Sequence, residues 1–306
     1  MLSEDVDRYI ALRGTLGYKL RKPARHLRAF ADHAASRGEA HVCAATVLAW
    51  AMAAGPTREA RAERFRNIAL FARFLHAEDS RNELPGRNPF AVRKTRPIPY
   101  IYTPDEIARI LDAAGKLRRQ RPNPLRRELY TTMFGLIAAT GLRVSEAIAL
   151  RVDDLWADGV LEIRETKFCK SRLVPLHPTV VQALDRYLEK RRRVAADSDH
   201  LFPSVQGRAL CPSTVNYIFR RLLREANVAL GRERQPRIHD LRHTFATRVL
   251  ERFGAERGEI ARHFVALSTY LGHADIRNTY WYLQATPEMM TDIAAAAEML
   301  VGSEAA

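Results

Sequence analysis

A proline-rich stretch, LPGRNPFAVRKTRPIP at residues 84–99, limits most strongly how this chain of 306 residues can fold. It holds four prolines and one glycine and has no apolar periodicity, which is typical of an extended linker. The segments on either side are long enough for each to form a hydrophobic core of its own. We therefore expect two domains, residues 1–96 and residues 97–306, with a linker at 84–99.

The segment before the linker is predicted to be helical. Helices are expected in SEDVDRYIALRG, beginning at a Ser3 cap, and in KPARHLRAFADHAASRG, AATVLAWAMAAG and TREARAERFRNIALFARFLHAE. The last of these carries an apolar stripe at helical spacing, made of Phe65, Ile68, Ala72 and Leu75. This stripe is the expected buried face of that helix.

The segment after the linker is predicted to be mostly helical with one small sheet. A helix begins at TPDEIARIL, where Thr103 caps, Pro104 takes the first helical position and Glu106 completes a capping box. Further helices are expected in RELYTTMFGLIAAT, RVSEAIALR, PTVVQALDRYLEKRRR, CPSTVNYIFRRLLREAN and HDLRHTFATRVLERFG, with a break at Gly141. VLEIRE and SRLVPL, joined by TKFCK, predict a β-hairpin. The expected fold class is mainly α with a small antiparallel β-sheet.

The charge balance favours a polyanionic partner. The net charge is +14, with 18 Lys and Arg against 10 Asp and Glu in residues 1–96 and 31 against 25 in the remainder. Clustered cations of this kind neutralise phosphates and release counterions. The candidate DNA contacts before and within the linker are Arg58, Arg61, Arg66, Arg73, Arg93, Lys94 and Arg96. The alternative is an ordinary solvated face.

Other features indicate a cytoplasmic protein without a membrane segment. The first residues, MLSEDVDRYIALRG, are acidic at their start and lack the apolar region of a signal peptide. No stretch approaches the roughly 20 apolar residues of a membrane helix. Cys43, Cys169 and Cys211 form no CxxC pair, so we expect small buried thiols and neither disulfides nor a zinc site.

Two motifs place arginines where they could bind a phosphate. In TGLRVSEAIAL, Arg143 follows a glycine turn at a helix start, and the alternative is a surface arginine paired with Glu146. In IHDLRHTFAT, His239 and Arg242 are three residues apart and share a helix face. Taken alone, each motif is unspecific.

A third motif, HADIRNTYWYL, contains two tyrosines on different faces of a helix. Residues two apart point roughly 200° away from each other, so Tyr280 and Tyr282 cannot face the same place. Ile276, Tyr280 and Leu283 form the expected buried stripe, which leaves Tyr282 directed elsewhere. Such a tyrosine is ordinary surface unless neighbouring groups activate it.

Taken together, these motifs are far more specific. ATGLRVSEAIAL, KFCKSRLVPL, HDLRHTFA and LGHADIRNTYWYL occur in one order over about residues 100–290 and resemble the tyrosine recombinase, or phage integrase, family. His273 precedes Tyr282 by the nine residues usual in that family. The helical segment before the linker is similar to the core-binding domain of the family in length, helicity and charge.

The resemblance implies a role for each matching residue. Arg143 and Arg242 would bind the scissile phosphate, and Tyr282 would attack it to form a 3′-phosphotyrosyl intermediate. The remaining roles would be a base at His239, an acid at Lys167, a phosphate ligand at His273 and second-layer support at Glu146. The family hairpin usually has a glycine and a small or polar residue where this chain has FC, so Lys170 stays an alternative acid and a DNA contact. No cofactor and no metal is implied.

The resemblance also implies partners. Double-stranded DNA recombination sites would be the substrate, and a tail helix at residues 287–301 would dock into a neighbouring subunit to link a tetramer. Accessory DNA-bending proteins are a further partner class. The TYWYL form favours integration or transposition of a mobile element, and a Xer-like resolvase of chromosome dimers is the alternative.

Two readings from other functional classes stay open at this point. His239 and His243 are four residues apart, as in zinc-binding helices, which suggests a metal-dependent phosphodiesterase. Against it, Asp240 and Leu241 follow His239 in place of the glutamate of HExxH. The other reading is a DNA-binding protein that carries the catalytic pattern without using it.

Overall fold

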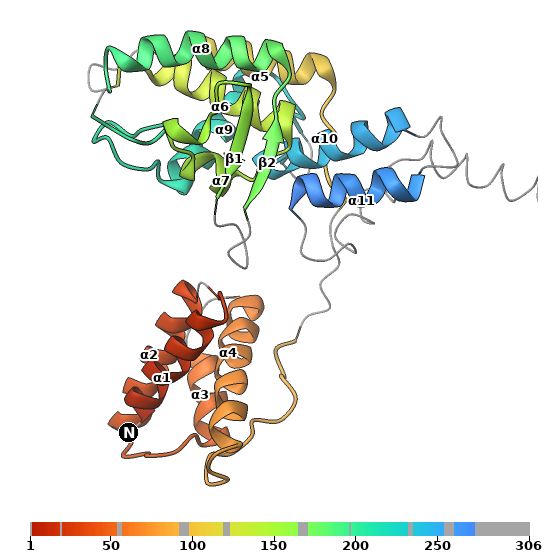
Figure 1. Cartoon of the computed structure of the whole chain (residues 1–306). Helices are drawn as coiled ribbons and strands as arrows, with labels where there is room; N and C mark the ends of the chain where they lie inside the picture. Colours follow the sequence, from red (N-terminus) through yellow and green to blue (C-terminus); the bar gives the residue numbers. More distant parts are fainter. Residues whose placement is uncertain are drawn as a thin grey trace, which may run out of the picture. The chain divides into compact units, whose positions relative to one another are not determined.

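A computed structural model describes residues 2–18, 20–53, 57–91, 98–118, 123–164, 171–195, 197–231, 235–253 and 260–272. These residues form two compact units, one with helices α1–α4 and one with helices α5–α11 and a two-stranded sheet (Figure 1). The predicted fold class, mainly α with a small antiparallel sheet, is confirmed. Within the described ranges, every helix is too short or too polar to cross a membrane.

The first unit is a bundle of four helices built around α4. Its elements are α1 (Leu2–Thr15), α2 (Arg21–Ser36), α3 (Ala44–Ala53) and α4 (Arg58–His76). The four residues of the predicted α4 stripe are all buried, and Phe71 of the same helix is buried with them. Helix α4 contacts each of the other three helices, so its apolar stripe forms the centre of this core.

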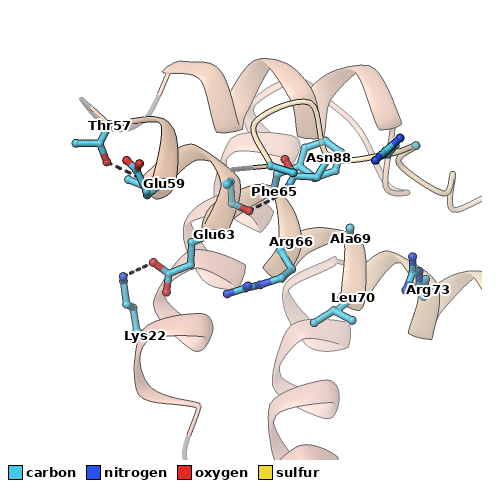
Figure 2. A pocket seen from close by; sticks show the side chains of 15 residues that line it. Lys22, Thr57, Glu59, Glu63, Phe65, Arg66, Ala69, Leu70, Arg73 and Asn88 are labelled. Atoms are coloured by element: carbon cyan, nitrogen blue, oxygen red, sulfur yellow. Dashed lines mark hydrogen bonds and ion pairs between the residues drawn. The ribbon is translucent and has the colours of Figure 1, made fainter. Parts of the chain in front are cut away.

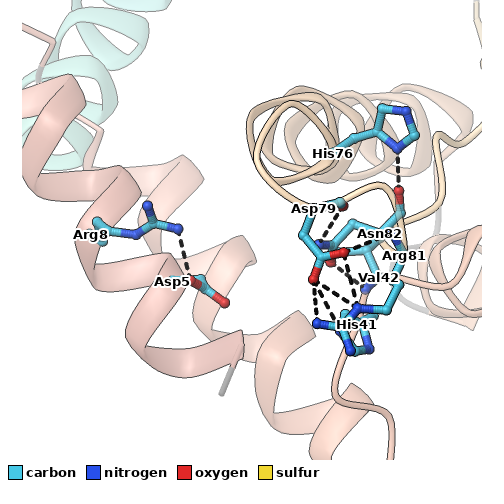
Figure 3. Close-up of polar contacts among 8 residues, drawn as sticks. All are labelled: Asp5, Arg8, His41, Val42, His76, Asp79, Arg81 and Asn82. Carbon is cyan, nitrogen blue, oxygen red and sulfur yellow. Dashed lines mark hydrogen bonds and ion pairs between the residues drawn. The ribbon is translucent and has the colours of Figure 1, made fainter.

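A polar cluster holds the segment after α4 against the segment before α3 (Figure 3). The buried Asn82 accepts the backbone N–H of Val42 on its side-chain oxygen at 3.0 Å, and its carbonyl accepts Nδ1 of His76 at 2.6 Å. Beside it, hydrogen bonds from Arg81 lower the pKa of Asp79 to about 2. These contacts close the bundle at one end.

The second unit surrounds a larger core. Its elements are α5 (Pro104–Gly115), α6 (Arg126–Thr140), α7 (Val144–Ala149), the 3-10 helix η1 (Val152–Asp154), β1 (Val160–Ile163), β2 (Arg172–Pro175), α8 (Pro178–Arg192), α9 (Pro212–Glu225), α10 (Ile238–Phe253) and α11 (Ile260–Leu271). Strands β1 and β2 pair antiparallel, with Leu161 opposite Val174 and both side chains buried. Helix α10 packs against α6 and α11, which brings the last two described helices onto the core of this unit (Figure 1).

Local signals set several of the boundaries. The capping box before α5 is present as predicted, since Thr103 accepts the N–H of Glu106 and the Glu106 side chain accepts the N–H of Thr103. Gly141 ends α6 in the left-handed region at φ 65°. The predicted start of α4 is also correct, because Thr57 accepts the N–H of Ala60 at 3.2 Å.

Three expectations were wrong or incomplete. Helix α1 begins at Leu2, so Ser3 lies inside the helix; Leu2 is buried, and its packing extends the helix past the capping residue. Cys211, at the N-cap position of α9, is exposed and Cys43 is half-buried, whereas Cys169 lies outside the described residues. Helix α11 was not expected from the sequence.

Candidate active site

The first part of the site is a tight turn between α6 and α7. A Cβ atom at Gly141 would lie 2.6 Å from Cδ1 of Phe245, and its positive φ disfavours a side chain as well. Glycine therefore lets the turn pack directly against α10. Arg143 follows two residues later, at the N-cap position of α7.

Arg143 is held on two sides. Its Nη1 donates to Oε1 of Glu146 at 2.6 Å, and its Nη2 donates to the carbonyl of Gly272 at 3.1 Å. The backbone N–H of Arg143 donates to the other carboxylate oxygen at 2.9 Å. The side chain is 30% exposed, so the guanidinium is oriented by the protein and still accessible.

Arg242 reaches the same place from α10. The residue is 1% exposed, and its Nη1 donates to the carbonyl of Gly141 at 2.7 Å while its Nη2 donates to the carbonyl of Leu271 at 2.6 Å. Arg143 and Arg242 are far apart in the sequence, but they bind the adjacent carbonyls of Gly272 and Leu271. The structure thus brings together the two arginines that the sequence motifs singled out.

The acceptors belong to the C-terminal end of α11. The carbonyl oxygens at a helix C-terminus lack intrahelical partners and carry partial negative charge, which favours nearby cations. A Cβ atom at Gly272 would lie 2.9 Å from Nη1 of Arg172, so this glycine permits the close approach of a third arginine.

Arg172, on β2, is this third arginine, and it is not among the site residues expected from the sequence. Its Nη1 and Nη2 donate to the two carboxylate oxygens of Glu146 at 3.1 and 2.8 Å, and its Nε donates to the carbonyl of Tyr270 at 2.8 Å. A signal was available in SRLVPL: alternation along a strand places Arg172 on the face of the buried Val174. A cation on a buried face needs a partner.

Glu146 is ionised between the two arginines. Burial would raise the pKa of its carboxyl group, but the hydrogen bonds and charge of Arg172, followed by those of Arg143, lower the pKa to about 2. The alternative expected for Arg143, an ion pair with Glu146, is therefore present. The pair forms part of a network that continues to α11.

His239 lies at the start of the same helix as Arg242 and is exposed. Desolvation by the surrounding protein atoms, followed by the charges of Arg242 and Arg237, lowers the pKa of His239 below its ordinary value. Its ring meets that of His243 edge to face, with centroids 4.7 Å apart. Burial, followed by His239, lowers the pKa of His243 to about 4. Both imidazoles are therefore neutral at pH 7, and a neutral imidazole can accept a proton.

The predicted cations of the first unit lie on α4. Arg58, Arg66 and Arg73 are exposed, and Arg61 is half-buried. Arg66 and Arg73 line a cavity of about 830 Å³, in which the Lys22 side chain pairs with Glu63 (Figure 2). Arg58 donates to the carbonyl of Pro89 at 3.4 Å. Two of the predicted DNA contacts therefore share one hollow surface.

Several predicted residues lie outside the described residues. These are Lys167, Lys170, His273, Tyr282, Arg93, Lys94, Arg96, the stripe with Ile276, Tyr280 and Leu283, and the tail 287–301. Within the described ranges, no group of three or more His, Cys, Asp and Glu side chains is arranged to hold a metal ion.

Comparison with known proteins identifies relatives along nearly the whole chain. Residues 101–289 match the phage integrase family. The chain is 36% identical over 294 residues to a putative integrase/recombinase, y4rB, of Sinorhizobium fredii, and the match covers 94% of each protein. It is 36% identical over 239 residues to the tyrosine recombinase XerD of Caulobacter vibrioides, covering 76% of this chain and 72% of that protein.

Solved structures share the fold at lower identity. The Tn1549 transposon integrase in complex with circular intermediate DNA superposes with a TM-score of 0.62 at 20% identity, covering 97% of this chain and 98% of that one. The XerH recombinase bound to palindromic difH substrate gives a TM-score of 0.62 at 18% identity, covering 90% and 78%. The arrangement of helices described above is thus one that DNA-bound recombinases also have.

Proposed function

Because this chain belongs to the phage integrase family and is a tyrosine recombinase, a DNA strand transferase, we propose that Arg143 and Arg242 bind the scissile phosphate of a DNA strand. The observation that supports this most is their attachment to the adjacent carbonyls of Gly272 and Leu271. A guanidinium carries five N–H donors in a planar fork, so a single arginine can hydrogen-bond to two phosphate oxygens. Fixed donors stabilise the charge of a pentavalent transition state.

In the proposed reaction, the phenol oxygen of Tyr282 attacks phosphorus. A bond forms between this oxygen and phosphorus as the bond to the 5′ oxygen breaks, which leaves a 3′-phosphotyrosyl enzyme and a free 5′-hydroxyl. His239 takes the phenol proton, for which its neutral imidazole is suited. His273 holds the phosphate, and Glu146 orients Arg143. Rejoining reverses these steps with the 5′-hydroxyl of another strand, so neither ATP nor a metal is needed.

We assign the proton donor for the 5′ oxygen to Lys167, with Lys170 as its rival. DNA with a bridging 5′-phosphorothiolate tests the assignment, because sulfur leaves without a proton donor. We expect this DNA to rescue Lys167→Ala, whereas Lys170→Ala needs no rescue. The reverse pattern would reassign the acid.

We further propose that the first unit, residues 1–96, is the core-binding domain, with the basic linker at 84–99 at its end. Both units are basic, which suits a protein that contacts one DNA polymer on two surfaces. The helix expected at 287–301 would dock into a neighbouring subunit and link a tetramer on two sites. Truncation after Ala285 should leave single-site binding intact and abolish tetramers in sedimentation with two-site DNA; tetramers that persist would refute the docking.

For the biological role we propose DNA integration of a mobile element, in the cytoplasm, where accessory DNA-bending proteins are available. The match to a putative integrase/recombinase over 94% of both proteins supports it. A Xer-like role in resolving chromosome dimers is the second candidate, supported by the XerD relatives. Sequencing the DNA that flanks the gene separates the two, because a mobile element is bounded by recombination sites of its own.

Trapping on suicide DNA tests the proposed chemistry. A nicked site loses the short 5′-hydroxyl strand after cleavage, so the enzyme stays attached to the 3′ phosphate. We expect a covalent adduct in EDTA, with the nucleotide mapped by peptide mass spectrometry to Tyr282. An adduct at another residue would overturn the assignment of the nucleophile. Activity that requires zinc or manganese would favour the phosphodiesterase instead.

A further inference from the structure

Arg172 connects three segments of the second unit that carry parts of the proposed site. It lies on β2, which begins two residues after Lys170, the second candidate acid. Its guanidinium binds Glu146 of α7 on one side and the Tyr270 carbonyl of α11 on the other. The side chain of Arg172 is 10% exposed and that of Glu146 is 8% exposed. This pair is therefore a buried junction between β2, α7 and α11.

The Glu146 carboxylate has its hydrogen-bonding capacity filled at this junction. Oε1 accepts Nη1 of Arg143 and Nη1 of Arg172, and Oε2 accepts the backbone N–H of Arg143 and Nη2 of Arg172. An ionised carboxylate offers about four lone-pair sites, and here four donors use them. Rotation of the carboxylate would break at least one of these hydrogen bonds. The two bonds from Arg172 therefore fix the orientation in which the carboxylate accepts the bonds from Arg143.

We propose that Arg172 is a positioning residue for strand cleavage: through Glu146 it sets the orientation of the Arg143 guanidinium, and through Tyr270 it sets the end of α11 from which Arg143 and Arg242 take their acceptors. The proposal rests on the proposed function, in which Arg143 binds the scissile phosphate. Arg172 itself does not contact the phosphate.

The expected consequence of losing Arg172 follows from the bonds that it makes. Without Arg172, Glu146 stays buried and keeps only its two hydrogen bonds from Arg143, so its carboxylate can shift relative to the Arg143 guanidinium. The Tyr270 carbonyl loses the hydrogen bond from Arg172 that aligns the last turn of α11. A misplacement of about 1 Å in a group that binds the transition state can cost about 100-fold in rate. DNA affinity depends on many phosphate contacts and should change little.

The first test is a double-mutant cycle on cleavage of nicked suicide DNA in single turnover. We expect Arg172→Met to slow cleavage by about 10- to 100-fold, with less than a threefold change in the dissociation constant. Arg172→Lys should recover part of the rate, because it keeps the charge but not the paired donors. In an Arg143→Lys background, Arg172→Met should add less than threefold, since residues that act as a unit are not additive. An equal effect in both backgrounds would overturn the proposal.

The second test separates positioning from structural support. Removing one member of a buried pair leaves the other charge uncompensated, whereas removing both is close to neutral for stability. Arg172→Met combined with Glu146→Gln should therefore recover the thermal stability that Arg172→Met loses, while cleavage stays slow. If the double variant recovers cleavage together with stability, Arg172 is a structural residue only. The double variant still provides this comparison of stability and cleavage if Arg172→Met alone fails to fold.

Arg191 provides a matched control. It is 3% exposed and also bridges segments by donating to the carbonyls of Ser198 and His200, and among the described residues it makes no hydrogen bond to Arg143 or Glu146. Arg191→Met should lower stability and show no coupling with Arg143→Lys. Wild-type protein that forms no adduct would refute the proposed function itself. Normal cleavage by wild type and by Arg172→Met would refute only the positioning role.

Discussion

The arginines on α4 of the first unit and the arginines around the end of α11 in the second unit differ in what holds them. Arg66 and Arg73 are exposed at the edge of a cavity. Arg172 and Arg242 are almost completely buried, and each is bonded to the carbonyl of a particular residue. Arginine thus serves on α4 as a solvent-exposed charge, and around the end of α11 as a side chain that hydrogen bonds hold in one orientation.

This difference has consequences for what each set can contribute. An exposed cation attracts phosphate over a distance, tolerates small displacements and is screened by salt. A buried guanidinium is costly to desolvate, so it is stable only where acceptors are already placed, and those acceptors fix its position. We expect substitutions on α4 to change DNA affinity, and substitutions around the end of α11 to change the rate of cleavage.

The largest effect should come from the nucleophile. Tyr282→Phe should abolish covalent attachment to suicide DNA and leave affinity nearly unchanged, because only the attacking oxygen is lost. Tyr280→Phe is the matched control and should be mild. Gel electrophoresis of the covalent DNA–protein adduct measures this. An adduct that persists in Tyr282→Phe but vanishes in Tyr280→Phe would show that Tyr280, and not Tyr282, is the nucleophile.

Arg143→Ala and Arg242→Ala should each slow cleavage by about two to three orders of magnitude, since each removes a fixed donor to the transition state. Arg242→Ala should also lower stability, because the Gly141 and Leu271 carbonyls lose their donor, at about 1–3 kcal/mol for each buried acceptor left unpaired. Single-turnover kinetics and thermal melts measure the two effects. If either substitution lowered DNA affinity as much as it lowers the cleavage rate, the arginines around the end of α11 would not differ in role from those on α4.

The pH dependence of cleavage should show a smaller effect. The base must be neutral, so the rate should fall about tenfold per pH unit below the pKa of His239, and this midpoint should lie below the ordinary value of about 6.5. The lowered pKa reflects desolvation and the charges of Arg242, Arg237 and Arg143, which Asp240 partly opposes. His239→Gln should be slow and lack this acidic limb. If the cleavage rate of His239→Gln still falls at low pH, another group is responsible for this pH dependence.

The smallest effect on cleavage is expected on α4. Arg66→Ala combined with Arg73→Ala should weaken DNA binding several-fold and make the slope of log affinity against log salt shallower by about 2. The cleavage rate at saturating DNA should not change. Binding measured at several salt concentrations checks this, and an unchanged slope would mean that these two side chains do not contact phosphate.

Local sequence was enough to locate most helices. Thr57, Thr103 and Gly141 act through hydrogen bonds and dihedral angles within a few residues, and each stands at the helix end that was expected. Packing overrode the local signal at Ser3, where the burial of Leu2 extends α1. Local rules succeed where the stabilising partner is close in sequence.

Helix α11 was missed although its buried residues, Phe264, Leu267 and Leu271, recur at helical spacing. The segment IARHFVALSTYL also contains valine, threonine and tyrosine, which have weaker helix propensity. Its stability comes from packing against α10, where Ala246 and Leu250 belong to the same core cluster. That partner belongs to the preceding helix, outside the segment, and cannot be inferred from the segment alone.

The sequence by itself determined the residue types of the site, the order of the motifs and the helix that carries His239 and Arg242. Only the tertiary structure showed that Arg143, Arg172 and Arg242 meet at the carbonyls of residues 270–272. The physical reason is that every residue carries a backbone carbonyl, so an acceptor of this kind has no signature in the side-chain sequence. Its availability depends on where a helix ends and on which segments pack against that end.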